Sequence, residues 1–243
     1  MKIFFLNLKR YIVTLYYLRF SQILWRVIYK FYKPSPSFNN KLLIRKILLK
    51  NYIFLNKRSS YIERGSFNFL NKIIDVNFDN WRLEGASDLW EYNLHYFDFV
   101  NSDLNDQKKV DISLSWIKNY RNFSLKGWDP YPTSLRIVNW IKFILSKNFN
   151  NDVLNSSLYG QSQYLNKKIE YHLLGNHIFT NAKALIFAGL YFDTNESTKW
   201  LKKGIKILEK ELEEQVLDDG GHFELSTMYH NIFLEDLIDI YNL

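Results

Sequence analysis

Hydrophobic residues recur at every third or fourth position along most of the chain after residue 81, which is the spacing of helices with one buried face. One such stripe is formed by Ile137, Trp140, Ile141, Ile144 and Leu145. The pattern predicts helices over residues 90–100, 112–120, 134–146, 154–174, 178–192, 197–217 and from Tyr229 onward. Helices in series with short connections predict an all-α array of antiparallel neighbours. Such pairs form an open solenoid or a closed toroid, and periodicity alone does not separate the two.

The N-terminal part of the chain predicts one long helix. It covers residues 8–33, is apolar on most sides, carries Arg19, Arg26 and Lys30, and ends before Pro34. We expect this helix to pack against the rest of the protein. A second interpretation stays open, because a basic and aromatic helix also fits a membrane surface.

An irregular lead-in connects this helix to the helical array. Residues 34–40 predict a linker. Residues 41–80 combine a basic apolar helix with short alternating pieces, of which 66–69 is typical of a strand. The sequence therefore predicts two parts, an N-terminal helix with its lead-in over 1–80 and a helical array over 81–243.

The last predicted helix begins near Thr227 and is still running when the sequence stops at Leu243 without a capping signal. We therefore expect the polypeptide to be cut short. A missing neighbouring helix would leave Phe233, Leu237 and Ile240 partly bare. The final helix is then expected to be the least stable part of the array.

Composition narrows the possible partners. The chain of 243 residues is 47% hydrophobic and 18% aromatic, as expected of a folded domain. Its net charge of +7 favours an anionic partner, which could be an acidic polysaccharide, a nucleic acid or a membrane surface. The sequence contains no zinc-ligand set, ribonucleoprotein motif or basic zipper, so no nucleic-acid partner is expected. With no cysteine there is no thiolate metal site.

Targeting signals give little guidance. The apolar run at the start is too short for a signal-peptide core, and no stretch reaches transmembrane length, so we expect no integral membrane segment. A cytoplasmic location is the default expectation, with peripheral membrane association through the N-terminal helix as the alternative.

Two helix junctions contain the residue types that carry chemistry. The five histidines are His95, His172, His177, His222 and His230. At the first junction, Gly175 is suited to a left-handed cap that ends one helix, and Asn176 is suited to begin the next. Asn176 and His177 are therefore expected to face a loop surface.

The second junction lies in the sequence EEQVLDDGGHFELSTMYH. Gly220 and Gly221 are expected to break a helix, a short extended piece follows, and Ser226 or Thr227 is expected to cap the last helix. Tyr229 then falls in the first turn of that helix. Free N–H groups and a positive dipole end at this position favour a nearby anion and help a phenol to lose its proton.

Four segments in order resemble one known family. These are WEYNLHYFDFV (90–100), GWDPYPTSLRIVNWI (127–141), the GNH segment (175–177) and DGGHFELSTMYH (219–230). Their order and spacing are similar to those of the N-terminal domain of heparinase II/III polysaccharide lyases. The resemblance implies an incomplete (α/α) toroid that binds acidic polysaccharide in a cleft. In whole members the toroid is followed by a β-sandwich domain, which we expect to be missing from this chain.

The same resemblance implies a β-elimination reaction that uses neither a metal nor an organic cofactor. The proton at C5 of a uronic acid is removed, and the oxygen at C4 leaves. A carbon next to a carboxylate is acidic only when hydrogen bonds or a cation offset the carboxylate charge. Asn176, helped by His177, is expected to supply that offset, and Tyr229 matches the tyrosine of the family that acts as general base and acid.

Further residues are expected to bind substrate. Arg136 would hold a carboxylate or sulfate with its planar guanidinium. The complete set of expected substrate-binding residues is Arg136, Asn139, Trp128, Tyr92, Asn93, His95, Glu224 and His230.

Each functional interpretation has a structural alternative. His95 and His172 are better explained as structural residues. Asn176 and His177 could form a helix cap, and Tyr229 could be a core residue. Glu224 with Asp218 and Asp219 would suit a glycoside hydrolase, although carboxylates beside a Gly-Gly turn usually form the turn. A binding module for acidic glycans without catalysis is a further alternative.

Overall fold

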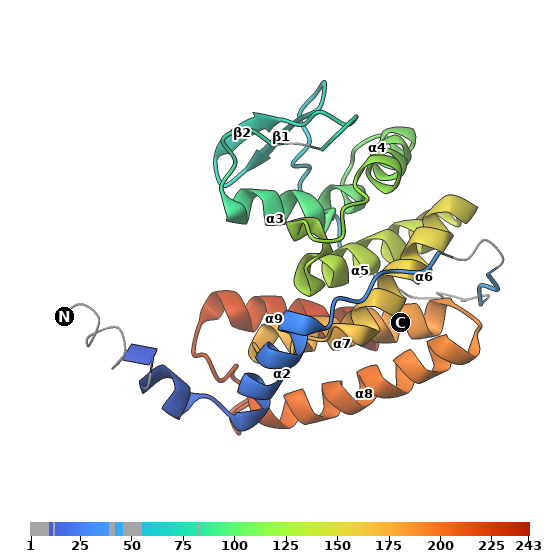
Figure 1. Cartoon of the computed structure of the whole chain (residues 1–243). Helices are drawn as coiled ribbons and strands as arrows, with labels where there is room; N and C mark the ends of the chain where they lie inside the picture. The colour runs from blue at the N-terminus through green and yellow to red at the C-terminus, as the bar shows by residue number, and fades with distance from the viewer. Residues whose placement is uncertain (1–9, 12, 39–41, 46–54, 82) are drawn as a thin grey trace.

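The computed structural model describes residues 10–11, 13–38, 42–45, 55–81 and 83–243. These residues form a mostly helical fold, as predicted, and the strands among them make one small two-stranded hairpin. Figure 1 shows the hairpin with α3 and α4 at one end of the molecule, α5 and α6 in the middle, and α7, α8 and α9 at the other end. The elements are α2 (Phe20–Phe31), β1 (Ser66–Phe69), β2 (Lys72–Asp75), α3 (Asp88–Tyr96), η1 (Asp98–Asn101), α4 (Asp106–Asn119), η2 (Lys126–Trp128), α5 (Pro130–Lys147), α6 (Asp152–Lys167), α7 (Gly175–Tyr191), α8 (Asn195–Gln215) and α9 (Thr227–Tyr241).

Consecutive helices run antiparallel, which is clearest for α7 and α8. A Cβ atom added to Gly189 would lie 2.6 Å from Cβ of Leu201, and one added to Gly204 would lie 2.9 Å from the carbonyl oxygen of Ala182. Near the other end of the pair, the Gln215 side chain donates a hydrogen bond to the Gly175 carbonyl. The two glycines therefore let the helix backbones approach more closely than a larger residue would permit.

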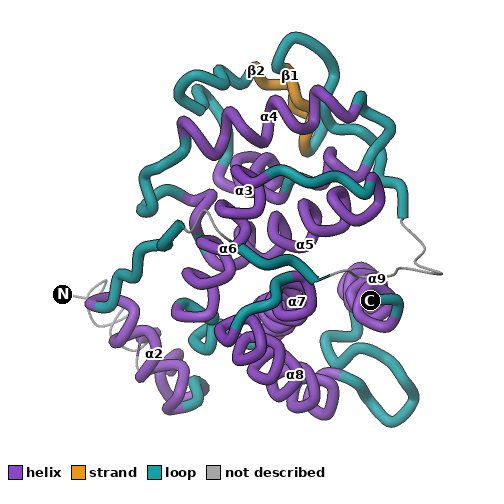
Figure 2. Tube along the Cα trace, turned by 90° about the vertical axis from the view of Figure 1, so that its right-hand side faces the viewer, coloured by secondary structure: helices purple, strands orange, loops and turns teal. Residues whose placement is uncertain are grey.

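Helices that are two apart in sequence run parallel. Between α5 and α7, the Tyr131 ring lies 4.6 Å from that of His177, and Asn181 donates a hydrogen bond to Ser134. Contacts between α7 and α9 progress in the same direction, from Phe179 with Phe233 to Lys183 with Asp236. Figure 2 shows α7 and α9 side by side. The N-terminal ends of α5, α7 and α9 therefore lie at the same end of the array, as in an (α/α) architecture.

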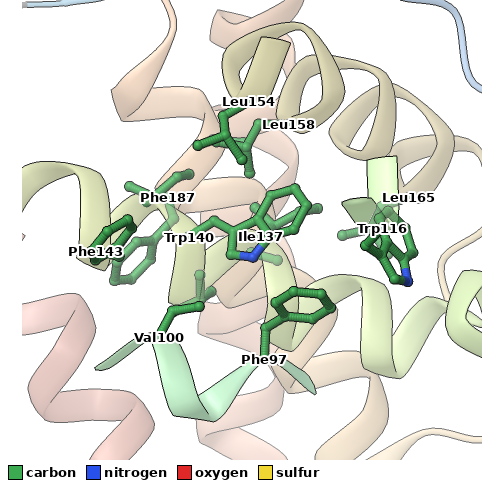
Figure 3. Close-up of a cluster of buried hydrophobic side chains, with 14 of the residues drawn as sticks. Phe97, Val100, Trp116, Ile137, Trp140, Phe143, Leu154, Leu158, Leu165 and Phe187 are labelled. Atoms are coloured by element: carbon green, nitrogen blue, oxygen red, sulfur yellow. The ribbon is translucent and has the colours of Figure 1, made fainter. Parts of the chain in front are cut away.

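The core lies between these layers. Aromatic and branched side chains from η1, α4, α5, α6 and α7 fill it, including Trp116, Trp140 and Phe187, each at most 1% exposed (Figure 3). Their contacts are mainly edge-to-face, as between Phe97 and Trp140 at 5.2 Å. Trp116 and Trp140 are not replaceable by smaller residues without leaving a cavity.

Four buried charged residues join α9 to α5 and α7. Lys142 donates two hydrogen bonds to Asp239, and Lys183 donates one each to Asp236 and Asp239, at 2.6–2.9 Å. Burial acts to raise the pKa of Asp239, but the two lysines outweigh it and hold that pKa below its ordinary value. Burial also acts to lower the pKa of Lys183, but the two carboxylates outweigh it and raise that pKa.

The structure corrects several predicted boundaries. The first two residues of the expected helix over 8–33 lie outside the described residues, and the helix is interrupted at Leu18 and Arg19, so that α2 is shorter. The expected helix over 154–174 ends at Lys167, because residues 168–174 form a loop. The strand predicted at 66–69 is confirmed and pairs with β2. Much of the helix expected after residue 41 lies outside the described residues.

The exposed face of α9 differs from the expected one. Phe233 is buried, and Leu237 and Ile240 are half-buried. The exposed apolar residues of α9 are Met228, Ile232, Leu234, Ile238 and Tyr241. The expectation of a bare Phe233 was wrong because α9 turns this residue toward Phe179, and Asp236 and Asp239 also face inward.

Candidate functional site

His177 lies in the first turn of α7, at the end of the array where the parallel helices begin. Its Nδ1 atom is 3.2 Å from Oε1 of Glu170, an ion-pair distance without hydrogen-bond geometry. Glu170 is buried, and its other carboxylate oxygen accepts a hydrogen bond from Asn181. The Tyr131 ring packs against the imidazole from α5. A buried carboxylate and a half-buried ring on two neighbouring segments therefore fix the position of a half-exposed histidine.

Asn176 precedes His177 and is also half-exposed. The backbone before it is unusual: Leu174 has φ 67° and Gly175 has φ 58°. Gly175 adopts the left-handed conformation expected from the sequence, but it begins α7 and does not end the preceding helix. A positive φ at a leucine is strained, and such strain is concentrated at functional sites. The first N–H groups of α7 lack acceptors within the helix, which favours an anion at this position.

Tyr229 lies in the first turn of α9, and two side chains connect it to the start of α7. Its ring is stacked on His222 at a centroid distance of 6.4 Å. Nε2 of His222 lies 3.2 Å from Oε1 of Gln215, whose amide donates to the Gly175 carbonyl. The Glu224 amide donates to Nδ1 of His222, so this ring is neutral and uses both nitrogens, and burial lowers its pKa.

The loop before α9 borders a shallow hollow. Its volume is about 340 Å³, and its lining residues are Gly221, His222, Leu225, Ser226, Thr227, His230 and Asn231. Glu224 points back toward α7, with Oε1 3.6 Å from a Cβ atom built on Gly175. The structure therefore brings Asn176, His177, Glu224 and the first turn of α9 to the same end. No group of three His, Asp or Glu side chains suited to a metal is found among the described residues.

Three of the expected substrate-binding residues are instead part of the core. Arg136 is fully buried, donates to the carbonyls of His95 and Gly127 and to Gln161, and lies 4.0 Å from the Trp116 ring. Burial lowers its pKa to about 9, so it remains charged at pH 7. In this position Arg136 cannot bind a substrate carboxylate, because no part of its guanidinium reaches solvent.

His95 and Trp128 are also buried, at 0% and 2% exposure. Nδ1 of His95 accepts a hydrogen bond from the Trp116 indole, and its Nε2 has no hydrogen-bond partner among the residues that the structure describes. Burial, followed by the charges of Arg136 and Lys126, holds the pKa of His95 well below its ordinary value. This placement agrees with the structural alternative for His95 and does not fit a role in contacting substrate.

Asn139, Tyr92 and Asn93 are bonded within the protein. Asn139 is buried and donates to the Tyr96 carbonyl and to Asp98. Tyr92 donates to Asp129, and burial is the main cause that raises the pKa of both groups. The side chain of Asn93 donates to the carbonyl four residues before it. Of these three, the half-buried pair of Tyr92 and Asn93 keeps some access to solvent.

Sequence reasoning missed Glu170 and Tyr131. Tyr131 lies inside the segment 127–141, from which only Trp128, Arg136 and Asn139 were expected to bind substrate. Glu170 lies in a stretch that reads as the end of a helix, where a carboxylate is ordinarily solvated. The glycoside hydrolase alternative has no support in the geometry, because Asp218 and Asp219 are exposed and Asp219 accepts a hydrogen bond from Gly221 in the turn.

Comparisons with known proteins bear on the family of the chain. A lyase of Bacteroides stercoris named heparin-sulfate lyase is 32% identical over 174 residues, 62% of this chain and 25% of that protein. Heparin-sulfate lyases of Pedobacter heparinus and Bacteroides thetaiotaomicron are 26% and 27% identical, over 66% and 62% of this chain and 28% and 25% of their own lengths.

The chain thus spans about a quarter of the length of these curated relatives. No solved structure matches it. The family model described as Heparinase II/III N-terminus matches residues 91–243, which is more than half of the chain. The chain therefore belongs to the heparinase II/III family, as the resemblance predicted, and carries its N-terminal domain.

Proposed function

We propose that this chain provides one side of the active site of a polysaccharide lyase that acts on a uronate-containing polymer. The observation that carries the proposal is the meeting of two helix N-termini, α7 with Asn176 and His177, and α9 with Tyr229. Family membership and the names of the relatives support the reaction class. The rest of the cleft is proposed to come from a β-sandwich domain, as the family resemblance implies.

The proposed reaction is a β-elimination. The Asn176 amide donates a hydrogen bond to the substrate carboxylate, and the positive end of α7 offsets the charge that develops when C5 loses its proton. Tyr229, as a phenolate, accepts that proton. The electron pair of the C5–H bond forms the C4–C5 double bond, the C4–O bond breaks, and the leaving oxygen takes a proton from the tyrosine hydroxyl.

The surroundings support these roles. His177 is braced by Glu170 and Tyr131, so its ring is pre-positioned beside Asn176. His222 and Gln215 connect the loop before α9 to the first residue of α7. The two halves of the constellation are therefore held at a fixed spacing, which a reaction with one substrate ring requires.

The test is an elimination assay that follows the ultraviolet absorbance of the new double bond with heparin, heparan sulfate and alginate. The chain is assayed alone and joined at Leu243 to the C-terminal remainder of the Bacteroides stercoris lyase. We expect activity in the joined protein and a loss of about 100-fold or more in Tyr229→Phe. Tyr241→Phe is the matched control, because Tyr241 is on the same helix and 91% exposed.

Two results would contradict the proposal. Activity that survives Tyr229→Phe would remove the assigned base. Binding of acidic polysaccharide without elimination, unchanged by Tyr229→Phe, would favour a glycan-binding module.

A further inference from the structure

Charge is distributed very unevenly along the chain. Residues 1–62 contain 13 of the 32 Lys and Arg residues and none of the 25 Asp and Glu residues. The remaining 181 residues carry a net charge of −6, so the positive charge of the whole chain comes from the N-terminal part. The helical array that holds the candidate site is not itself basic. The partner of the basic region must therefore be sought separately from the substrate.

One face of α2 attaches it to the array. Tyr29 donates a hydrogen bond to the Ile169 carbonyl at 2.7 Å, and the Trp25 ring lies 4.9 Å from that of Tyr171. Gln22 donates to the His172 carbonyl. These contacts are all made to the loop between α6 and α7. They fix which side of α2 faces the protein and which side faces solvent.

The opposite face of α2 presents an apolar stripe to solvent. Phe20, Leu24, Val27 and Phe31 follow a spacing of four, three and four residues, which places them within about 60° of arc on a helix. They are 78%, 44%, 53% and 79% exposed. Exposed basic side chains accompany the stripe, namely Arg26 and Lys30 within α2 and Lys33 after it. Figure 2 shows α2 at the edge of the molecule.

We propose that this stripe docks on a membrane surface with anionic headgroups. A helix with a solvent-facing apolar stripe and basic flanks lies in the plane of the lipid interface, where its apolar side chains enter the acyl boundary and its cations meet lipid phosphates. Charge complementarity identifies the partner as anionic. The aliphatic Leu24 and Val27 favour lipid over a polysaccharide, which would stack on aromatic rings and leave aliphatic side chains unused.

The position of the stripe also separates it from the candidate site. The loop over residues 168–174 holds Glu170 and leads into Asn176, and α2 contacts this loop with the face opposite to the stripe. Docking through the stripe therefore leaves the N-terminal ends of α7 and α9 uncovered by α2. This inference stands independently of the proposed lyase function.

The test is cosedimentation of the 243-residue chain with vesicles of phosphatidylcholine alone and of phosphatidylcholine mixed with phosphatidylglycerol. We expect binding to the mixed vesicles and little binding to phosphatidylcholine. Phe20→Ser with Phe31→Ser should lower the partition coefficient by about tenfold or more. Lys30→Gln should lower it about fivefold, since each cation near an anionic surface contributes about 1 kcal/mol.

A control variant removes two exposed apolar side chains elsewhere. Leu70 and Ile73 of the hairpin are 56% and 59% exposed, so Leu70→Ser with Ile73→Ser should leave vesicle binding unchanged. Circular dichroism confirms that the variants are folded. Absence of binding to the mixed vesicles overturns the proposal. Two other results would also overturn it. In one, Phe20→Ser with Phe31→Ser leaves vesicle binding intact and abolishes binding to heparan sulfate. In the other, the same variant leaves vesicle binding intact and abolishes self-association seen by light scattering.

Discussion

Removal of the Asp239 carboxylate should destabilise the protein severely. Asp239 accepts two hydrogen bonds from Lys142 and one from Lys183, and all three side chains are at most 3% exposed. In Asp239→Ala, Lys183 keeps Asp236, but Lys142 loses the carboxylate that takes both of these hydrogen bonds. A buried charge left without its partner costs about 3–5 kcal/mol, a large share of the 5–15 kcal/mol typical of a domain.

Urea unfolding followed by circular dichroism measures this loss. The control is Glu235→Ala on the same helix, because the ion pair of Glu235 with Lys57 leaves both side chains 32% exposed and should contribute about 0–1 kcal/mol. Replacing Lys142 by Met together with Asp239 by Leu removes the unpaired charge and should cost less than Asp239→Ala alone. Equal losses in Asp239→Ala and Glu235→Ala would refute the reasoning.

Three further predictions concern packing, pH and dynamics. Gly204→Ala should destabilise the protein by about 1–3 kcal/mol in the same urea assay, because the added methyl group meets the Ala182 carbonyl. The free energy of unfolding should fall as the pH drops below about 6.5. Burial lowers the folded-state pKa of His95, His172 and His222, so the unfolded chain binds protons at a higher pH than the folded chain does. His95→Gln should make the free energy of unfolding depend less steeply on pH. In hydrogen exchange, amides of α9 should exchange faster than those of α7, which has neighbours on both sides; equal protection would contradict this.

The helices could be predicted from the sequence because each has an apolar stripe of its own. The predicted helix ends were less accurate where a charged side chain or the backbone conformation determines where the helix begins or ends. The helix α4 begins at Asp106, six residues before its predicted start, where the Asn105 side chain caps it by accepting a hydrogen bond from the Lys108 amide. Its first turns have no apolar stripe, since the charged Lys109 turns inward and donates to the Ser102 carbonyl. The residues before α7 read as helix, yet α6 ends at Lys167, and Leu174 and Gly175 adopt positive φ where α7 begins.

Buried charged residues were the main failure of sequence reasoning. Arg136 was expected to bind substrate, and no role was predicted for Lys142 or Lys183, since a charged side chain is rarely buried. Their burial depends on partners that no local pattern reveals: Lys142 and Asp239 are 97 positions apart. The helix junctions were predictable because glycine and helix-capping residues act locally, which is why Asn176, His177 and Tyr229 could be placed on helix starts before their mutual arrangement was known.

The central claim is that the start of α7 forms part of a binding site for a uronate carboxylate. Isothermal titration calorimetry of the 243-residue chain with a heparan sulfate oligosaccharide tests it most directly. Asn176→Ala should weaken binding about tenfold to a hundredfold, the effect of losing a hydrogen bond to a charged group. Asn195→Ala, at the exposed start of α8 at the other end of the array, should leave the affinity unchanged. Equal affinities for the two variants, or no binding by the unmodified chain, would contradict the account.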